Sequence, residues 1–328
     1  MHYLQVRIAA STVAATPQIG RVLIRPRRVL ASQTARVNLT GTHNTMFKAV
    51  LTSQATVVQA FAVDPVGGHM YASQIMQAGI QLPGESAPVP WETREAAGDI
   101  AITQMSLATN QVLGVMYITG AGHGAGLGVE RAADGTWLWC DADTSGSGFA
   151  RAIGRVKFQN GAVLAGKTIP LYRPFGAASG SHGLSCAIDP TYNRIMVRRT
   201  YPDPGNGRRH YLYDLTAFKA GNFTPLAIVD QEANSTSPDG RSIGTYQGGG
   251  TWGNYLYSLE GNPKLNNSYL TSLDWRTGQV VQRALITTHM DLEPVQREPE
   301  AIAIWAPNPA TPQTVKFGYG FAGGANAA

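Results

Sequence analysis

The sequence predicts an all-β protein that folds as a five-bladed β-propeller. Two observations support this: the composition favours strands over helices, and a strand pattern of alternating small and large residues returns five times along the chain. Charged residues make up only 14% of the 328 residues, while the chain contains 37 Gly, 19 Pro and 13 Tyr. Few charges, many turn-forming residues and many aromatic residues are typical of β-structure.

The repeated pattern first appears in residues 60–63, which read Ala-Phe-Ala-Val. It returns in residues 126–129, 185–188 and 301–304, and in a glycine-rich form in residues 248–251. Successive copies begin 53 to 66 residues apart. A period of this size, combined with strand-forming residues, predicts one four-stranded blade for each repeat.

The small residues have a steric explanation. The innermost strands of all blades converge on the propeller axis, so side chains on one face of each strand meet the backbone of the next blade. Only Gly, Ala or Ser fits at such a close approach. Because successive side chains of a strand point to opposite faces, the alternation places every small residue on that crowded face.

Each inner strand is followed by a turn and then by a second strand rich in aromatic or β-branched residues. These second strands read HMYASQ, TWLWCD, RIMVRRTY, YLYSLE and TVKFGYG. Outer hairpins are predicted over residues 99–119, 151–166 and 267–286, and the pairs Asn160-Gly161 and Thr277-Gly278 mark two of their turns. The third repeat has a longer connection between RHYLYDL and its outer strand.

The fifth repeat lacks two outer strands. Two strand-like runs precede the first repeat, TARVNLTG in residues 34–41 and TMFKAVLTS in residues 45–53. We predict that they complete the last blade, because such closure joins the two ends of the chain and removes an open sheet edge. The expected organisation is an N-terminal arm over residues 1–33, a propeller over residues 34–324 and a disordered tail over residues 325–328.

Charge is unevenly distributed along the chain. Residues 1–63 contain seven basic and no acidic residues, whereas the remainder contains 19 basic and 21 acidic residues. The basic segment is either a solvated tail or an assembly arm that docks on an acidic protein or a polyanion. The residues that would make the assembly contacts are Arg7, Arg21, Arg25, Arg27 and Arg28.

No targeting or membrane segment is expected. Arg7 interrupts the apolar run that a secretory signal peptide needs. No run of about 18 apolar residues predicts a transmembrane helix, so membrane insertion is not expected. We expect no nucleic-acid partner either.

Cys140 and Cys186 do not have the spacing of metal ligands, and we predict buried free cysteines in strands, with a disulfide as the alternative. Residues 141–146 resemble the start of a calcium loop, with Asp141, Asp143 and Ser145 as candidate ligands. Ala152 stands where the twelfth position of such a loop requires an acid. The alternative is therefore a surface loop that binds no cofactor.

Polar residues gather where the inner strands begin. Seven of them occupy matched positions just before a small residue or directly beside such a position: Gln59, His123, His182, Gln247, Arg297, Glu298 and Glu300. In a propeller these positions surround one mouth of the axial channel, where converging strand ends make the default binding site. The residues either satisfy one another's hydrogen bonds or form a small polar pocket for a ligand or ion.

Several aromatic residues with polar neighbours could stack on sugar rings or anchor a protein contact. They are Trp91, Tyr172, Tyr201, Tyr246, Trp252 and Tyr269. Of these, we assign Trp252 to the ligand-binding mouth together with the seven polar residues.

The sequence favours a binding protein over an enzyme. It contains no nucleophile-elbow, zinc-protease or P-loop motif, and the glycines of GAGHGAGLG fall at every second position, which does not match a phosphate-binding loop. Ser185 lies inside an inner strand, where a nucleophile elbow cannot form. Acid–base or metal chemistry by the two histidines with Glu298 and Glu300 is the alternative.

Seven segments, taken in order, resemble one family: the propellers of helveticin J, teichoic acid biosynthesis protein C and phage receptor-binding proteins. The segments are QAFAVDPVGGHMYASQ, GDIAITQMSL, GHGAGLGVE, AIDPTYNRIMVRR, YLYDLTAFKAGNFTPLA, YQGGGTWGNYLYSLEG and REPEAIAI. The resemblance covers about residues 46–324. It implies a five-bladed propeller and offers no established catalytic residue.

The same resemblance implies a function. Family members sit at phage tail tips and bind cell-wall glycopolymers, often as trimers, and others are secreted bacteriocin-like proteins. We therefore expect a non-catalytic tail protein of the virion that recognises a host cell-surface glycopolymer, contacts other tail proteins through its basic arm and forms a homo-oligomer. The alternatives are a secreted propeller associated with wall polymers and a structural tail component without a ligand.

Overall fold

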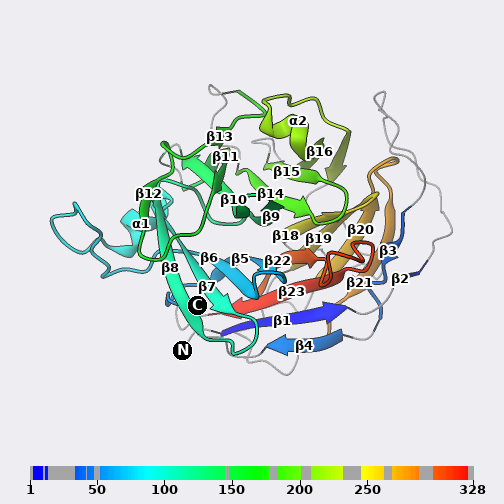
Figure 1. Cartoon of the computed structure of the whole chain (residues 1–328), viewed down its shortest axis with the longest axis horizontal. Helices are drawn as coiled ribbons and strands as arrows, with labels where there is room; N and C mark the ends of the chain where they lie inside the picture. The colour runs from blue at the N-terminus through cyan, green and yellow to red at the C-terminus, as the bar shows by residue number, and fades with distance from the viewer. Residues whose placement is uncertain are drawn as a thin grey trace.

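The computed structural model confirms the five-bladed propeller. It describes residues 3–9, 12–13, 34–41, 43–47, 52–144, 146, 148–176, 183–200, 208–231, 245–261, 268–287 and 298–323. Five sheets of four or five strands surround a common centre, and Figure 1 shows the first strand of each repeat lying closest to it.

The strands of the first three blades follow the chain closely. Blade 1 contains β5 (Val58–Asp64), β6 (His69–Ile75), β7 (Ile100–Ser106), β8 (Val112–Thr119) and the added β12 (Val163–Ala165). Blade 2 contains β9 (Leu127–Ala132), β10 (Gly135–Thr144), β11 (Ala150–Val156) and β13 (Leu171–Tyr172). Blade 3 contains β14 (Ser185–Asp189), β15 (Arg194–Thr200), β16 (Arg208–Asp214) and β17 (Ala227–Gln231).

The remaining elements complete the ring and its connections. Blade 4 contains β18 (Thr245–Trp252), β19 (Tyr255–Gly261), β20 (Tyr269–Asp274) and β21 (Val280–Leu285). Blade 5 contains β22 (Glu298–Trp305), β23 (Lys316–Gly323), β1 (Tyr3–Ala9) and β4 (His43–Phe47). A separate pair is formed by β2 (Thr12–Val13) and β3 (Arg36–Val37), and two short helices, α1 (Trp91–Ala97) and α2 (Leu215–Lys219), lie in connections.

The crowding expected at the axis is present. The inner strands β5, β9, β14, β18 and β22 contact one another in a closed ring. A Cβ atom added to Gly126 would lie 2.5 Å from the backbone nitrogen of Cys186, and one added to Gly248 would lie 2.5 Å from the Cα of Ala301. The small residues therefore let neighbouring backbones approach, as the alternating pattern predicts.

Large side chains fill the space between adjacent blades. Trp139, Tyr213 and Phe218 are buried in one cluster between blades 2 and 3. Tyr257, Phe317 and Tyr319 are buried in another between blades 4 and 5. The two cysteines are free and buried in β10 and β14, as predicted. In the described part of the chain, neither helix has the length and hydropathy needed to cross a bilayer.

The N-terminal closure of blade 5 is confirmed, but only one of the two predicted runs takes part, since β4 overlaps the beginning of TMFKAVLTS at residues 45–47. The third strand is β1, which pairs with β23 from Tyr3↔Gly323 to Ala9↔Phe317, and β4 is the fourth. The expectation that residues 1–33 all lie outside the propeller is therefore wrong for residues 3–9. Residues 12–13 of the arm form β2. The remaining residues of the arm, which include Arg21, Arg25, Arg27 and Arg28, and the tail after residue 323 lie outside the described residues.

The run TARVNLTG does not join blade 5. Only Arg36–Val37 is a strand, and it pairs with β2. A turn follows, in which the Asn38 side chain accepts a hydrogen bond from the Thr40 backbone at 3.1 Å. The segment packs on blade 4 instead, where the Val37 backbone donates to the Tyr257 hydroxyl at 3.0 Å. The turn interrupts the ladder that a full strand would need.

Two of the three predicted outer hairpins are confirmed. The hairpin over residues 99–119 is formed by β7 and β8, and the hairpin over residues 267–286 is formed by β20 and β21. The predicted hairpin over residues 151–166 is wrong. Strand β12 pairs in parallel with β8 of blade 1, with Val163 opposite Tyr117. The Asn160-Gly161 turn is the reason: the Asn160 side chain accepts from the Val115 backbone at 3.0 Å, and Gly161 donates to the Val115 carbonyl at 2.7 Å. The turn thus covers the open edge of blade 1.

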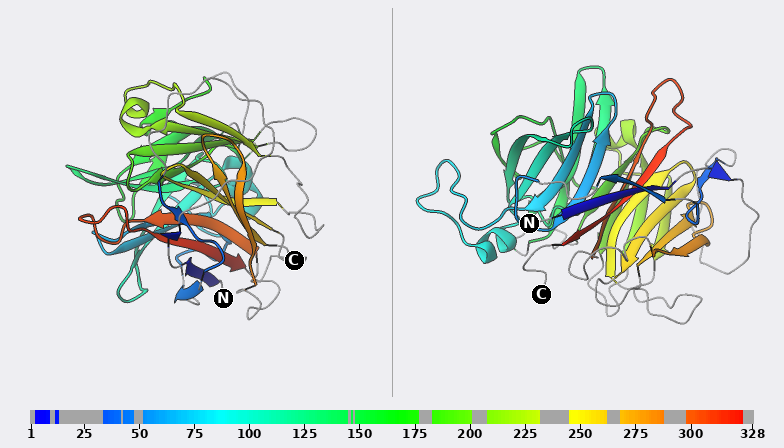
Figure 2. Two further views of the ribbon diagram at one scale, coloured as in Figure 1. Left: turned by 90° about the vertical axis from the view of Figure 1, so that its right-hand side faces the viewer. Right: turned by 90° about the horizontal axis from the view of Figure 1, so that it is seen from below.

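A long connection between β6 and β7, residues 76–99, projects from one side of the propeller in Figure 1 and Figure 2. It contains α1, which the sequence analysis did not predict. Gly98 ends this helix with a φ of 70°, a left-handed conformation that favours glycine. The connection returns to the sheet at the end where the inner strands begin.

We predict that Gly248→Ala destabilises the protein more than Gly250→Ala, although both glycines lie on one face of β18. The new methyl group at 248 would meet the Ala301 backbone, whereas at 250 it would meet the Ile302 side chain, 2.9 Å away at Cγ2, which can turn aside. Overpacking should cost about 3 kcal/mol at 248 and about 1 kcal/mol at 250. Urea denaturation measures both free energies of unfolding, and an equal or reversed order would contradict the steric account.

Candidate functional site

The ends at which β5, β18 and β22 begin surround a cavity of about 320 Å³. Four residues assigned to this mouth from the sequence line it: Gln59, His123, Gln247 and Glu300. The cavity is also lined by five residues not predicted there, namely Asp141, Phe149, Arg198, Arg208 and Tyr246. The structure thus brings polar side chains from all five blades to one end of the axial channel.

Strand bulges aim some of these side chains. Three inner strands have a register shift at this end, between Val58 and Ala60, between Tyr246 and Gly248, and between Glu300 and Ile302. Gln59 and Gln247 are the extra residues of two bulges, and a bulge re-aims the side chain it carries. The Gln247 amide donates to the Glu298 carboxylate at 3.2 Å, which places Glu298 beside the cavity.

The basic side of the cavity is built around an aromatic ring. The guanidinium carbons of Arg198 and Arg208 lie 4.4 and 5.1 Å from the ring centroid of Tyr246. Arg198 is held by donating to the Ser185 hydroxyl at 3.0 Å and to the Gly183 carbonyl at 2.9 Å. Arg208 is only 8% exposed, and burial together with repulsion from Arg198 lowers its pKa to about 10. Arg208 therefore remains cationic at neutral pH.

The acidic side is less negative than its composition suggests. The Asp141 carboxylate accepts from the backbone nitrogens of Gly124 at 3.0 Å and Ala125 at 3.1 Å, yet burial raises the pKa of Asp141 to about 7. Burial, helped by the nearby Glu298 charge, raises the pKa of Glu300 well above its usual range. Asp141 is therefore partly protonated near neutral pH, and burial favours the protonated form of Glu300 as well.

Two histidines belong to the site in different ways. The His123 ring stacks on Phe149 with ring centroids 5.5 Å apart. The pKa of His123 is lowered mainly by burial and also by the positive charge of Arg198. Phe149 itself is 45% exposed and forms part of the rim. His210 is fully buried against Tyr246, and burial lowers its pKa to about 3, so both rings are neutral at physiological pH.

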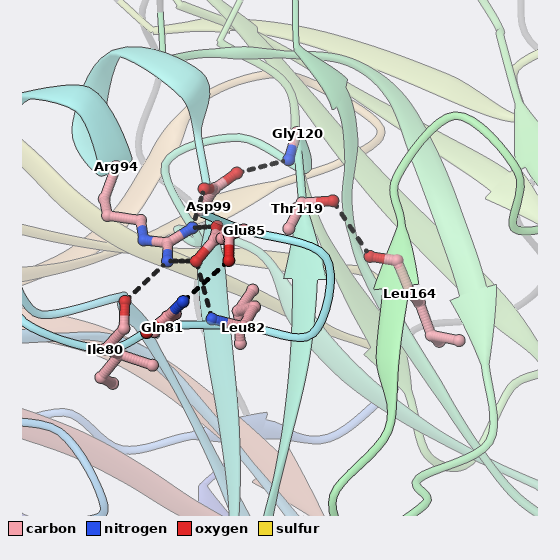
Figure 3. Close-up of polar contacts among 9 residues, drawn as sticks. All are labelled: Ile80, Gln81, Leu82, Glu85, Arg94, Asp99, Thr119, Gly120 and Leu164. Atoms are coloured by element: carbon pink, nitrogen blue, oxygen red, sulfur yellow. Dashed lines mark hydrogen bonds and ion pairs between the residues drawn. The ribbon is translucent and has the colours of Figure 1, made fainter. Parts of the chain in front are cut away.

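Figure 3 shows the polar contacts that hold Gly120, where the loop between β8 and β9 begins. Arg94 is buried and donates to both Glu85 oxygens at 2.6 and 2.7 Å and to Asp99 at 2.9 Å. The other Asp99 oxygen accepts from the Gly120 backbone at 2.8 Å. This buried ion cluster thereby fixes the start of the loop in which His123 follows three residues later.

Three sequence assignments do not fit the structure. Trp252 is fully buried at the opposite end of β18, where its indole donates to the Thr191 hydroxyl at 3.1 Å, so it is not at the mouth. Asp141 and Asp143 lie in β10 and not in a loop, and Asp143 pairs with Arg151 at 3.1 Å and Arg173 at 2.6 Å. The predicted calcium loop is therefore wrong for these two residues.

Some assigned residues cannot be placed. His182, Arg297 and Ser145 lie outside the described residues, and the side chain of Arg7 in β1 is not described. Within the described ranges, no group of three or more His, Cys, Asp or Glu side chains has an arrangement that could hold a metal ion.

Strand register could have identified one of the site residues that the sequence pattern did not predict. Arg198 lies opposite Ser185 on one side and opposite His210 on the other. Once the small position at Ser185 is known, counting across blade 3 therefore leads to Arg198. Arg208 is the first residue of β16, and Tyr246 is the second residue of β18. The residues next to them do not alternate between small and large, so the sequence pattern did not indicate that these two side chains reach the mouth.

The opposite end of the channel has a larger cavity of about 480 Å³. Its lining includes Leu127, Ile188, Ile302 and Ile304 from the inner strands. The connection between β22 and β23 crosses this end, where the Tyr192 hydroxyl donates to the Gln313 side chain at 2.6 Å. We favour the smaller cavity as the functional site because charged and polar side chains converge there.

Comparison with known proteins places the chain in a family. A family model described as "Phage 5-bladed beta propeller receptor binding platform domain" matches residues 57–324. A search of curated proteins found no match.

Two solved structures illustrate the range of structural likeness. The tail fiber of Staphylococcus aureus phage P68 matches with a TM-score of 0.57 at 18% identity, over 85% of this chain and 53% of that one. The dihydro-heme d1 dehydrogenase NirN in complex with DHE gives a TM-score of 0.32 at 12% identity, over 74% of this chain and 40% of that one. The chain thus spans about half the length of the tail fiber, whose likeness shows the shared fold. Because the family model covers most of the chain, this protein belongs to the family of phage five-bladed β-propeller receptor-binding platform domains.

Proposed function

We propose that this protein is a receptor-binding component of a phage tail, and that the mouth lined by Gln59, His123, Gln247 and Glu300 recognises a host cell-surface glycopolymer. The observation that carries the proposal is the convergence of amide, guanidinium and aromatic groups on one cavity at the channel end. Membership of a receptor-binding family supports the same role.

The chemistry of the mouth suits a sugar-containing polymer. Gln59 and Gln247 offer both donors and acceptors, which match the hydroxyl groups of a sugar. Phe149 is exposed at the rim, where an aromatic ring can stack on a sugar face. A cavity of about 320 Å³ lies at the lower end of the range for small-ligand pockets, so it would admit one repeat unit or an end group.

The proposal includes binding without cleavage. Two of the mouth carboxyls already have structural partners: Asp141 accepts from backbone amides, and Glu298 accepts from the Gln247 amide. Among the described residues, Glu300 is then the one lining carboxyl without such a partner, whereas glycosidases use a pair of carboxyl groups. Glycoside hydrolysis needs one carboxylate free to attack or to activate water. We expect the size distribution of a purified wall polymer to stay unchanged after prolonged incubation with the protein.

The proposal also places the protein in the virion tail as a homo-oligomer, with the trimer that the family implies. The basic N-terminal segment supports contacts with other tail proteins, because seven basic residues without an acidic one favour an acidic neighbour.

We predict that Gln247→Ala weakens binding to purified host cell walls about fivefold, because it removes a hydrogen-bonding group worth about 1 kcal/mol. The measurement is a cosedimentation isotherm on cell walls. Gln313→Ala is the matched control, since Gln313 is exposed at the opposite end of the channel. Equal losses in the two variants, or no binding by the unaltered protein, would count against recognition at this mouth.

A second prediction concerns assembly. Replacing Arg25, Arg27 and Arg28 with Ser should lower incorporation of the protein into phage particles, because the arm loses its attraction to an acidic neighbour. The control replaces three exposed basic residues of the propeller, Lys157, Lys167 and Lys316, with Ser. Quantitative immunoblotting of purified particles measures both, and a similar loss in the two triple variants would remove the arm from the proposal.

A further inference from the structure

We propose that Arg198 and Arg208, which both pack against the Tyr246 ring and line the mouth cavity, form a binding site for a single phosphate-class anion. This inference rests on the proposed function to the extent that such an anion would be part of the recognised polymer. The site itself follows from the geometry of three side chains from β15, β16 and β18.

The first argument is the state of Arg208. Its side chain lines the cavity and is more than nine-tenths buried. A buried arginine is normally paired with a carboxylate or satisfied by hydrogen bonds. Among the described residues, the Arg208 guanidinium packs on the Tyr246 ring and makes no hydrogen bond or close ion pair. Its donors are therefore available to a group in the cavity.

The second argument is the position of Arg198. Its hydrogen bonds to Ser185 and Gly183 fix the guanidinium beside the same aromatic ring. Two like charges then share one low-dielectric space, and each disfavours the other. An anion in the cavity that contacts both guanidinium groups would relieve this repulsion and form charge-assisted hydrogen bonds with them.

The third argument is that the nearby acids do not neutralise the pair. Glu260 is buried and interacts electrostatically with both Arg283 and Arg208, while Asp141 and Glu300 line the cavity. Burial favours the protonated form of all three carboxyls. The neutral rings of His123 and His210 add no charge near neutral pH. Burial raises the pKa of Glu298 beside the cavity as well, so the negative charge near the two guanidinium groups is reduced.

The choice of phosphate follows from the shape of the donors. The Arg208 guanidinium is a planar fork that matches two oxygens of one anion, and Arg198 adds the N–H groups that its bonds to Ser185 and Gly183 leave over. Donors from two side chains suit a tetrahedral group with several oxygens. Gln59 and Phe149 line the same cavity and could contact the sugar or polyol on either side of that group.

The test is a titration of the full-length protein with inorganic phosphate and with glycerol 3-phosphate at low salt, followed by calorimetry. We expect Arg208→Gln to weaken the affinity for both ligands by about tenfold or more, since a charged donor pair is lost. Arg209→Gln is the matched control, because it removes the same charge from the next residue, which is exposed and paired with Asp230. That variant should bind phosphate within about twofold of the unaltered protein.

A second variant separates geometry from charge and guards against misfolding. Arg208→Lys keeps the positive charge without the planar fork. This variant should fold and should bind phosphate, but with lower affinity than the unaltered protein. Thermal unfolding without ligand should show Arg208→Gln at least as stable as Arg209→Gln, because it removes a buried unpaired charge. Absence of phosphate binding, or equal affinity in Arg208→Gln and Arg209→Gln, would overturn the site.

The outcomes also separate this site from the proposed function. Phosphate binding that depends on Arg208, together with no binding to cell walls, would keep the anion site and remove glycopolymer recognition. Cell-wall binding that is insensitive to Arg208→Gln and to competing phosphate would keep the recognition and remove the anion site.

Discussion

The close approach of five inner strands at one axis is the constraint on which the rest of the structure depends. Backbone meets backbone where Gly126 faces Ser185 and Cys186, and where Gly248 faces Ala301. A methyl group at either glycine would displace a whole strand, because the nearest atoms belong to the neighbouring backbone and not to a flexible side chain. The ring closes only because each repeat supplies a small residue at this height.

The same constraint creates the mouth. Larger polar residues replace the small ones at the end of the channel, so neighbouring inner strands can no longer pack backbone against backbone there. Three inner strands change register at this end. The bulges at Gln59 and Gln247 place amide groups at the channel end, and the loop of His123 is fixed from outside by Asp99 and Arg94. Crowding in the channel and an open polar cavity at its end are thus two results of one geometry.

Local patterns in the sequence predicted what is local in the structure. Period-two alternation gave the inner strands, the turns and the second strands of all blades, and it led to four residues of the mouth. It did not give the partners of β1 and β12, because pairing between distant segments leaves no trace in local alternation. Trp252 was misplaced for a similar reason: it follows the small positions of β18 along the chain, and the strand carries it to the opposite end.

The unpredicted residues carry most of the charge of the site. Arg198 and Arg208 come from the second and third strands of blade 3, and they reach the mouth because β14, β15 and β16 are in register across the blade. A propeller places a full set of strand ends around its channel, so side chains from outer strands can add to a site whose frame the inner strands build. Burying two guanidinium groups beside one ring costs free energy that a purely structural core would avoid. Such a cost is typical of functional sites, where local stability is lost in favour of binding.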